Sequence, residues 1–76
     1  MSRLRAVRAR DMIRYLQSPG FSQVRQRGSH RFFSHLDGRT ATVPDHRGED
    51  LGRGIVHSIP RDIDKTPADL MKWLSR

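Results

Sequence analysis

The chain has 76 residues, which is the length of one small domain. Because it contains no cysteine, disulfide bonds and thiolate metal sites are excluded. No apolar run approaches the roughly 20 residues that a membrane-spanning helix needs, and no charged and then apolar leader precedes a small-residue cleavage site. We therefore expect a single cytoplasmic domain over residues 1–76 that does not bind a membrane.

Positive charge is concentrated in the first part of the chain. Lys and Arg number 15 against 8 Asp and Glu, so the net charge is +7. Residues 1–31 hold eight arginines against Asp11 alone, whereas the charges of residues 32–76 sum to zero. A surface that serves only solubility mixes both signs, so this segregation predicts a face that meets a polyanion such as nucleic acid. A solvated or disordered basic arm is the alternative.

The first predicted element is a helix over residues 9–18. Its apolar residues recur at helical spacing: Ala9, Met12, Ile13 and Leu16. Pro19 and Gly20 end the helix, because proline disfavours a helical residue before it and glycine accepts the left-handed conformation found at helix ends.

Three short segments with β-favouring residues follow, at residues 21–27, 30–35 and 39–43. Gly28 marks a tight turn between the first two segments, and Asp37-Gly38 is a strong hairpin signal between the last two. The sequence therefore predicts a three-stranded antiparallel meander.

Side chains alternate between the two faces of a strand. Along the second strand, this alternation sends Phe33 to one face and His30 with Phe32 to the other. If Phe33 faces the helices, His30 lies on the open face of the sheet.

The last third of the chain predicts a polar loop and two helices. Residues 45–54 form the loop, and isoleucines at four-residue spacing indicate the next helix: Ile55, Ile59 and Ile63. Pro60 predicts either a kink or a restart of that helix with Ser58 as the new cap. Residues 66–69 supply a cap, a first-turn proline and an acidic residue, which predict a short final helix. These elements together indicate an α+β fold.

Histidine is the residue type here that suits proton transfer near neutral pH, because its unperturbed pKa is about 6.5. His35 and His57 have no distinguishing context, and we expect both to be solvated. His46 is expected to be an ordinary loop histidine. His30 differs because it opens an aromatic strand and has arginines close by in the sequence. From the residues alone, a catalytic role and an ordinary surface role of His30 are equally supported.

Several other chemistries lack their motifs. The sequence has no histidine pair at helical metal-binding spacing, no G-x-S-x-G elbow and no glycine-rich phosphate loop. Cleavage of RNA requires fewer catalytic groups from a protein, because the RNA 2′-hydroxyl is itself the nucleophile. It needs only a base to remove its proton and positive charge beside the phosphate. DNA would require a metal or an enzyme nucleophile. If the protein is a nuclease, RNA is the consistent substrate, and no metal or cofactor is expected.

A series of short motifs runs in order through residues 7–63. They are Gly20-Phe21, Val24-Arg25-Gln26-Arg27-Gly28-Ser29-His30, Phe33, Asp37-Gly38-Arg39, Thr42-Val43-Pro44 with His46, and Gly54 with Ile59. The most specific part is G-S-H followed by an aromatic residue and then V-P-x-H. In a chain of this length, the set resembles the HicA family of toxins from prokaryotic toxin–antitoxin pairs.

The resemblance implies an α-β-β-β-α fold similar to double-stranded-RNA-binding domains, with helices on one face of a three-stranded antiparallel sheet. A short C-terminal helix would follow. It also implies messenger-RNA cleavage that arrests translation, and a HicB-type antitoxin that blocks the toxin. The catalytic histidine of the family falls on His30.

The leading hypothesis is therefore a metal-independent endoribonuclease, monomeric when free, in which His30 acts as general base on the RNA 2′-hydroxyl. The residues expected to bind RNA are Arg25, Arg27, Arg31 and Ser29. Gly28 shapes the turn that presents His30, and strand alternation sends Arg31 away from it. Two alternatives remain: a non-catalytic RNA-binding module, and a protein whose basic face serves only an acidic antitoxin.

Overall fold

The computed structural model describes residues 6–76. Its elements are α1 (Ala9–Gln17), β1 (Ser22–Arg27), β2 (His30–Ser34), β3 (Thr40–Pro44), α2 (Arg53–Asp62) and α3 (Pro67–Leu74). The strands form one antiparallel sheet in the order β1-β2-β3. The predicted α+β class and the α-β-β-β-α order with a C-terminal helix are confirmed. Within the described residues, no helix is long and apolar enough to cross a membrane.

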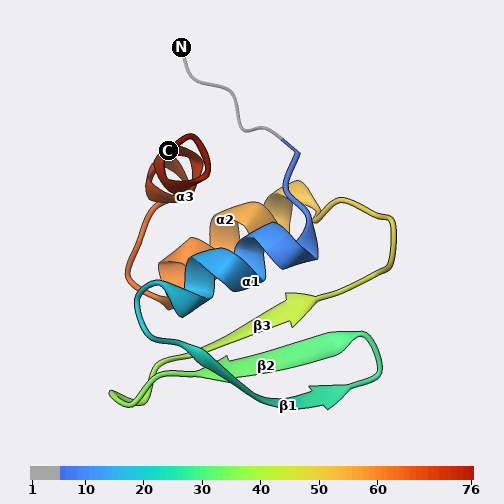
Figure 1. Ribbon diagram of the computed structural model, residues 1–76, viewed down its shortest axis with the longest axis vertical. Coiled ribbons are helices and arrows are strands. Elements are labelled where there is room, and N and C mark those ends of the chain that lie inside the picture. The colour runs from blue at the N-terminus through green and yellow to red at the C-terminus, as the bar shows by residue number, and fades with distance from the viewer. Residues whose placement is uncertain (1–5) are drawn as a thin grey trace.

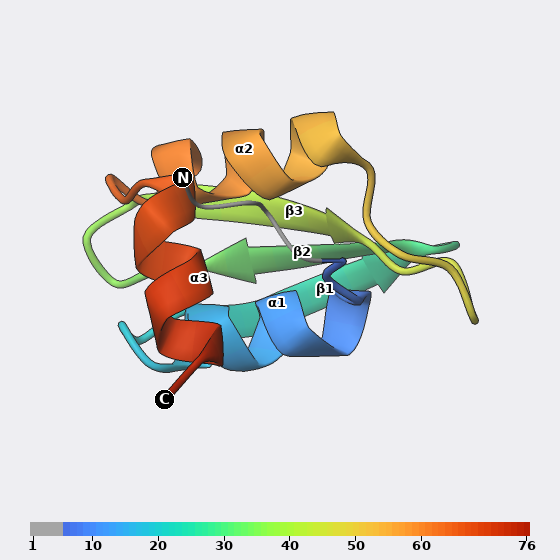
Figure 2. The same cartoon turned by 90° about the horizontal axis from the view of Figure 1, so that it is seen from above.

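All three helices lie on one side of the sheet, and the other face of the sheet is left open (Figure 1). Seen from the helical side, α1 and α2 run along the strands (Figure 2). The α3 helix lies across the C-terminal ends of α1 and α2 (Figure 2). The α3 helix packs against both of the other helices. The fold therefore has one covered and one uncovered sheet face.

The hydrophobic core fills the space between the sheet and the helices. Its buried residues are Val7, Ala9, Met12, Tyr15, Leu16, Phe21, Phe33, Ala41, Val43, Val56, Ile59, Ile63 and Leu70. The β2 strand contributes Phe33, and β3 contributes Ala41 and Val43 from alternate positions, as the period of a half-buried strand requires. Every residue of β1 is exposed, so this edge strand lies beyond the core.

The α1 helix begins without a capping side chain on the residue before it. Instead, the backbone N–H of Arg8 donates to the Asp11 carboxylate at 3.2 Å. The helix ends at Gln17, and Gly20 turns the chain toward β1 with φ of 101°. That left-handed conformation is the one that glycine adopts at low cost.

Of the two outcomes predicted for Pro60, a kink or a restart capped by Ser58, the restart does not occur, because one helix continues through Pro60 to Asp62. Pro60 lies in the last turn, so its missing N–H removes a hydrogen bond only near the helix end. The ring of Pro60 is buried in the core, and burial offsets part of that cost. The hydroxyl of Ser58 lies 3.4 Å from the carbonyl of Ile55 inside the same helix.

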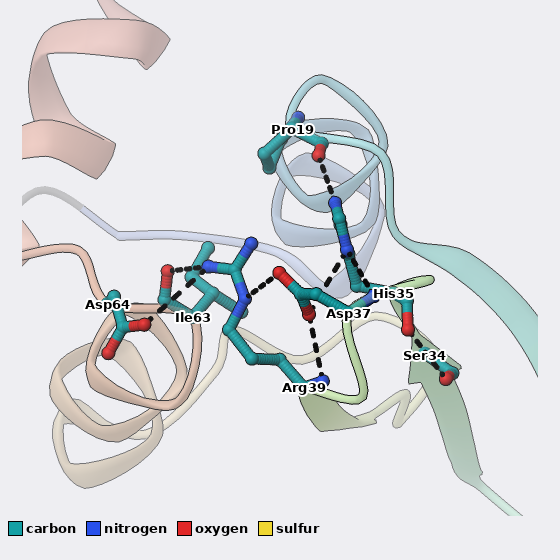
Figure 3. A network of polar contacts seen from close by, with 7 residues as sticks. All are labelled: Pro19, Ser34, His35, Asp37, Arg39, Ile63 and Asp64. Atoms are coloured by element: carbon teal, nitrogen blue, oxygen red, sulfur yellow. Dashed lines mark hydrogen bonds and ion pairs between the residues drawn. The ribbon is translucent and has the colours of Figure 1, made fainter.

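A polar network joins the β2–β3 turn to two neighbouring segments (Figure 3). The His35 ring accepts a hydrogen bond from the Asp37 backbone N–H at Nδ1 and donates from Nε2 to the Pro19 carbonyl, each at 3.0 Å. The Arg39 guanidinium donates to the Asp37 carboxylate at 2.8 Å and to the Ile63 carbonyl at 2.6 Å. The expectation that His35 is solvated is wrong, because these bonds hold its ring half-buried at the end of α1.

This network predicts a pH dependence of stability. The backbone N–H of Arg39 lowers the pKa of Asp37 below its ordinary value of 3.8, and the Arg39 side chain lowers it further. A carboxyl with a depressed folded pKa contributes stability above its unfolded pKa, and this contribution is lost as the pH falls through the folded pKa. We expect Asp37→Asn to lower the free energy of unfolding at pH 7, with a difference from the parent that shrinks as the pH falls below 3.8.

Urea denaturation between neutral pH and about pH 2 measures this difference, because urea titrates the free energy of unfolding without adding salt. Asp62→Asn is the matched control, since this exposed carboxylate has no ion pair in residues 6–76. A gap between Asp37→Asn and the parent that stays constant over the whole pH range would contradict the assignment.

Candidate functional site

The hairpin between β1 and β2 places the predicted catalytic histidine. Gly28 and Ser29 form a two-residue turn, and Gly28 has φ of 58°, in the left-handed region that favours glycine. The Gln26 side-chain amide also donates to the Gly28 carbonyl at 3.1 Å. Because the turn is this short, Arg27 pairs directly with His30. Gly28 therefore has the turn position that the sequence predicts for it.

The open face of the sheet brings His30 together with two of the predicted RNA-binding arginines. Directly paired residues on neighbouring strands share a face. One row across the sheet is Arg27, His30 and Pro44, and the next is Arg25, Phe32 and Thr42. The Arg25 guanidinium carbon lies 4.6 Å from the centre of the Phe32 ring, which is a cation–π distance.

The His30 side chain is exposed and forms no hydrogen bond or ion pair with any residue of 6–76. Arg25 and Arg27 are likewise exposed and have no carboxylate partner in that range. The strand residues that share this face are Ser22, Arg25, Arg27, His30, Phe32, Ser34, Thr40, Thr42 and Pro44, and none of them is acidic. An imidazole beside two free guanidinium groups can accept a proton next to a bound phosphate.

Arg31 lies on the opposite face, as the alternation along β2 predicts. Its Nε donates to the Asp45 carboxylate at 2.7 Å, and its Nη1 lies 3.4 Å from the Gln23 side-chain oxygen. The Arg31 side chain is 33% exposed. The structure thus separates Arg31 from the other two predicted RNA-binding arginines by the thickness of the sheet.

Asp45 is a residue that the sequence analysis does not single out. Besides binding Arg31, it donates its backbone N–H to the Ser29 carbonyl at 2.6 Å. The two residues that flank His30, Ser29 and Arg31, therefore both form hydrogen bonds with Asp45. A signal did exist, since a polar residue directly after β3 falls beside the start of β2 in an antiparallel pair.

The remaining histidines, and two arginines of the basic segment, lie away from the open face or outside the described residues. His46 is exposed in the loop after β3, where it lines a groove with Ser29 and Arg31. His57 is exposed on α2, as expected. Two arginines of the basic segment, Arg3 and Arg5, lie outside the described residues. Across residues 6–76, no three histidine or carboxylate side chains gather in a way that could hold a metal ion.

Comparison with known families gives a match that covers well over half of the chain. Residues 9–64 match the family model of the HicA toxin of bacterial toxin–antitoxin systems. This range contains β1, β2, β3, α1 and α2, and it includes His30 with the arginines around it. A comparison with curated proteins gives no match.

The contact of the Asp45 carboxylate with Arg31 predicts a measurable contribution to stability. We expect Asp45→Ala to lower the free energy of unfolding by about 1 kcal/mol, because it removes a partly buried, charge-assisted hydrogen bond to Arg31. Asp50→Ala is the control, since its pair with Arg8 is about half exposed and 3.5 Å long. That change should cost less than about 0.5 kcal/mol. Equal denaturation midpoints for the two variants would contradict the anchoring role.

Proposed function

The chain belongs to the HicA family of toxins, and on this basis we propose that it is a metal-independent endoribonuclease that cleaves messenger RNA and thereby arrests translation. The observation that carries the proposal is the position of His30. Its ring is exposed and unpartnered within residues 6–76, on an open sheet face, directly opposite Arg27. That arrangement leaves the imidazole accessible to a polynucleotide.

In the proposed reaction, His30 removes the proton from a ribose 2′-hydroxyl. The 2′-oxygen then attacks the adjacent phosphorus, and the 5′-oxygen leaves with a proton from the imidazolium or from water. The products are a 2′,3′-cyclic phosphate and a free 5′-hydroxyl. Arg25 and Arg27 bind the phosphates near the cut and stabilise the negative charge that grows on the reacting phosphate. Gly28 and Ser29 hold the turn from which His30 projects.

A toxin of a toxin–antitoxin system has an antitoxin partner, and we propose that this partner is a HicB-type protein. Covering the open face would block His30 and neutralise Arg25 and Arg27 together. The free toxin would then act as a monomer in the cytoplasm, where its messenger-RNA substrate is found.

A non-catalytic RNA-binding module is the second candidate. The stacking of Arg25 on Phe32 favours it, because guanidinium and aromatic planes are platforms on which bases stack. Such a module would retain RNA without producing fragments. The two candidates therefore differ in product formation rather than in affinity.

Replacement of His30 tests the proposal. We expect His30→Ala to lower the rate of RNA cleavage by a factor of about 10² to 10⁴, the range that a general base supplies. Cleavage by the parent should persist in the presence of a metal chelator. His57→Ala is the control, because it removes an exposed imidazole from α2, away from the open face. Equal cleavage by His30→Ala and the parent would remove His30 from the mechanism.

The same pair of variants can be compared in living cells. Induced expression of the parent and of His57→Ala should arrest bacterial growth, whereas His30→Ala should not. Growth arrest by all three proteins would contradict a role of the imidazole in toxicity.

A further inference from the structure

A groove of about 540 Å³ lies on the helical side of the sheet, around the edge from His30. Its walls come from the start of α1, the β1–β2 turn and the loop between β3 and α2, which meet at one end of the molecule (Figure 1). Its charged and titratable lining residues are Arg8, Arg10, Arg31, Asp45, His46, Arg47 and Glu49. Four arginines thus face two carboxylates.

Ion pairing leaves two of these arginines free. Arg31 is paired with Asp45, and Arg8 lies 3.5 Å from Asp50 outside the groove. Arg10 and Arg47 are exposed and have no ion pair anywhere in residues 6–76. Free guanidinium groups in a concave site are suited to phosphate, which they bind through two parallel hydrogen bonds.

The groove and the open face share one boundary. Gly28 and Ser29 line the groove, and the next residue along the chain is His30 on the other side. A polynucleotide strand with a ribose at His30 therefore has only this two-residue turn to cross before it reaches the groove.

We propose that this groove is a second phosphate-binding subsite, in which Arg10 and Arg47, with His46 beside them, hold the RNA backbone one or more nucleotides away from the cut. The inference rests on the proposed function. It assigns to the helical side of the sheet a role in binding substrate, separate from the proton transfer at His30. Glu49 opposes binding there, because it adds a negative charge to the lining of the same groove.

The test measures binding of an oligoribonucleotide with 2′-O-methyl groups, which cannot be cleaved through the 2′-oxygen. Dissociation constants are determined by fluorescence anisotropy at several salt concentrations. Log affinity falls as log salt rises, and each lost phosphate contact makes this negative slope shallower by about 0.7 for a single strand. We expect the double variant Arg10→Ala, Arg47→Ala to make the slope shallower by about 1.4.

The control is the double variant Arg61→Ala, Lys72→Ala, which removes the same charge from exposed positions that do not line the groove. Its slope should stay close to that of the parent. Glu49→Gln should tighten binding, an effect in the opposite direction that a folding defect would not produce. Equal slopes for the two double variants, or unchanged affinity for Glu49→Gln, would overturn the subsite.

The outcome for the groove is separate from the outcome for catalysis. His30→Ala should bind the uncleavable RNA with an affinity near that of the parent. If His30→Ala cleaves like the parent while the Arg10, Arg47 double variant loses binding, the subsite stands and the catalytic proposal fails. A salt-independent affinity of the parent would overturn the subsite and favour an acidic protein segment as the occupant.

Discussion

The alternation of side chains along β2 is the constraint on which the candidate site depends. Phe33 is 1% exposed because it must fill the core beneath the helices. Its burial forces His30 and Phe32 to the open face and Arg31 to the covered face. A shift of β2 by one residue would turn the His30 imidazole toward the covered face and the Phe33 ring toward the open face. The same packing that stabilises the fold therefore presents the proposed base to solvent.

Asp45 connects this constraint to the loop after β3. It binds Ser29 through its backbone and Arg31 through its carboxylate. The residues directly before and after His30 are therefore both fixed by hydrogen bonds to Asp45. The imidazole itself forms no hydrogen bond within residues 6–76. The backbone around His30 is thus fixed, while the ring stays available for a ligand.

Most of the elements could be predicted because their signals are local. Gly28 marks the β1–β2 turn, and the short turn alone pairs Arg27 with His30. Thr66 accepts the predicted N-cap hydrogen bond from Asp69. Features that depend on register could not be predicted. The bulge at Val24, which no local pattern indicates, turns Gln23 toward the covered face. His35 was missed because Pro19 approaches it only in the folded chain.

The chemistry of the cut bond tests the central claim most directly. An RNA that carries a single 2′-deoxyribonucleotide on the 5′ side of a mapped cleavage site lacks the hydroxyl that His30 is proposed to activate. The account predicts that cleavage at that bond stops, and that the parent RNA yields fragments ending in a 2′,3′-cyclic phosphate. Continued cleavage at the deoxy position, with fragments ending in a free 3′-hydroxyl, would contradict it.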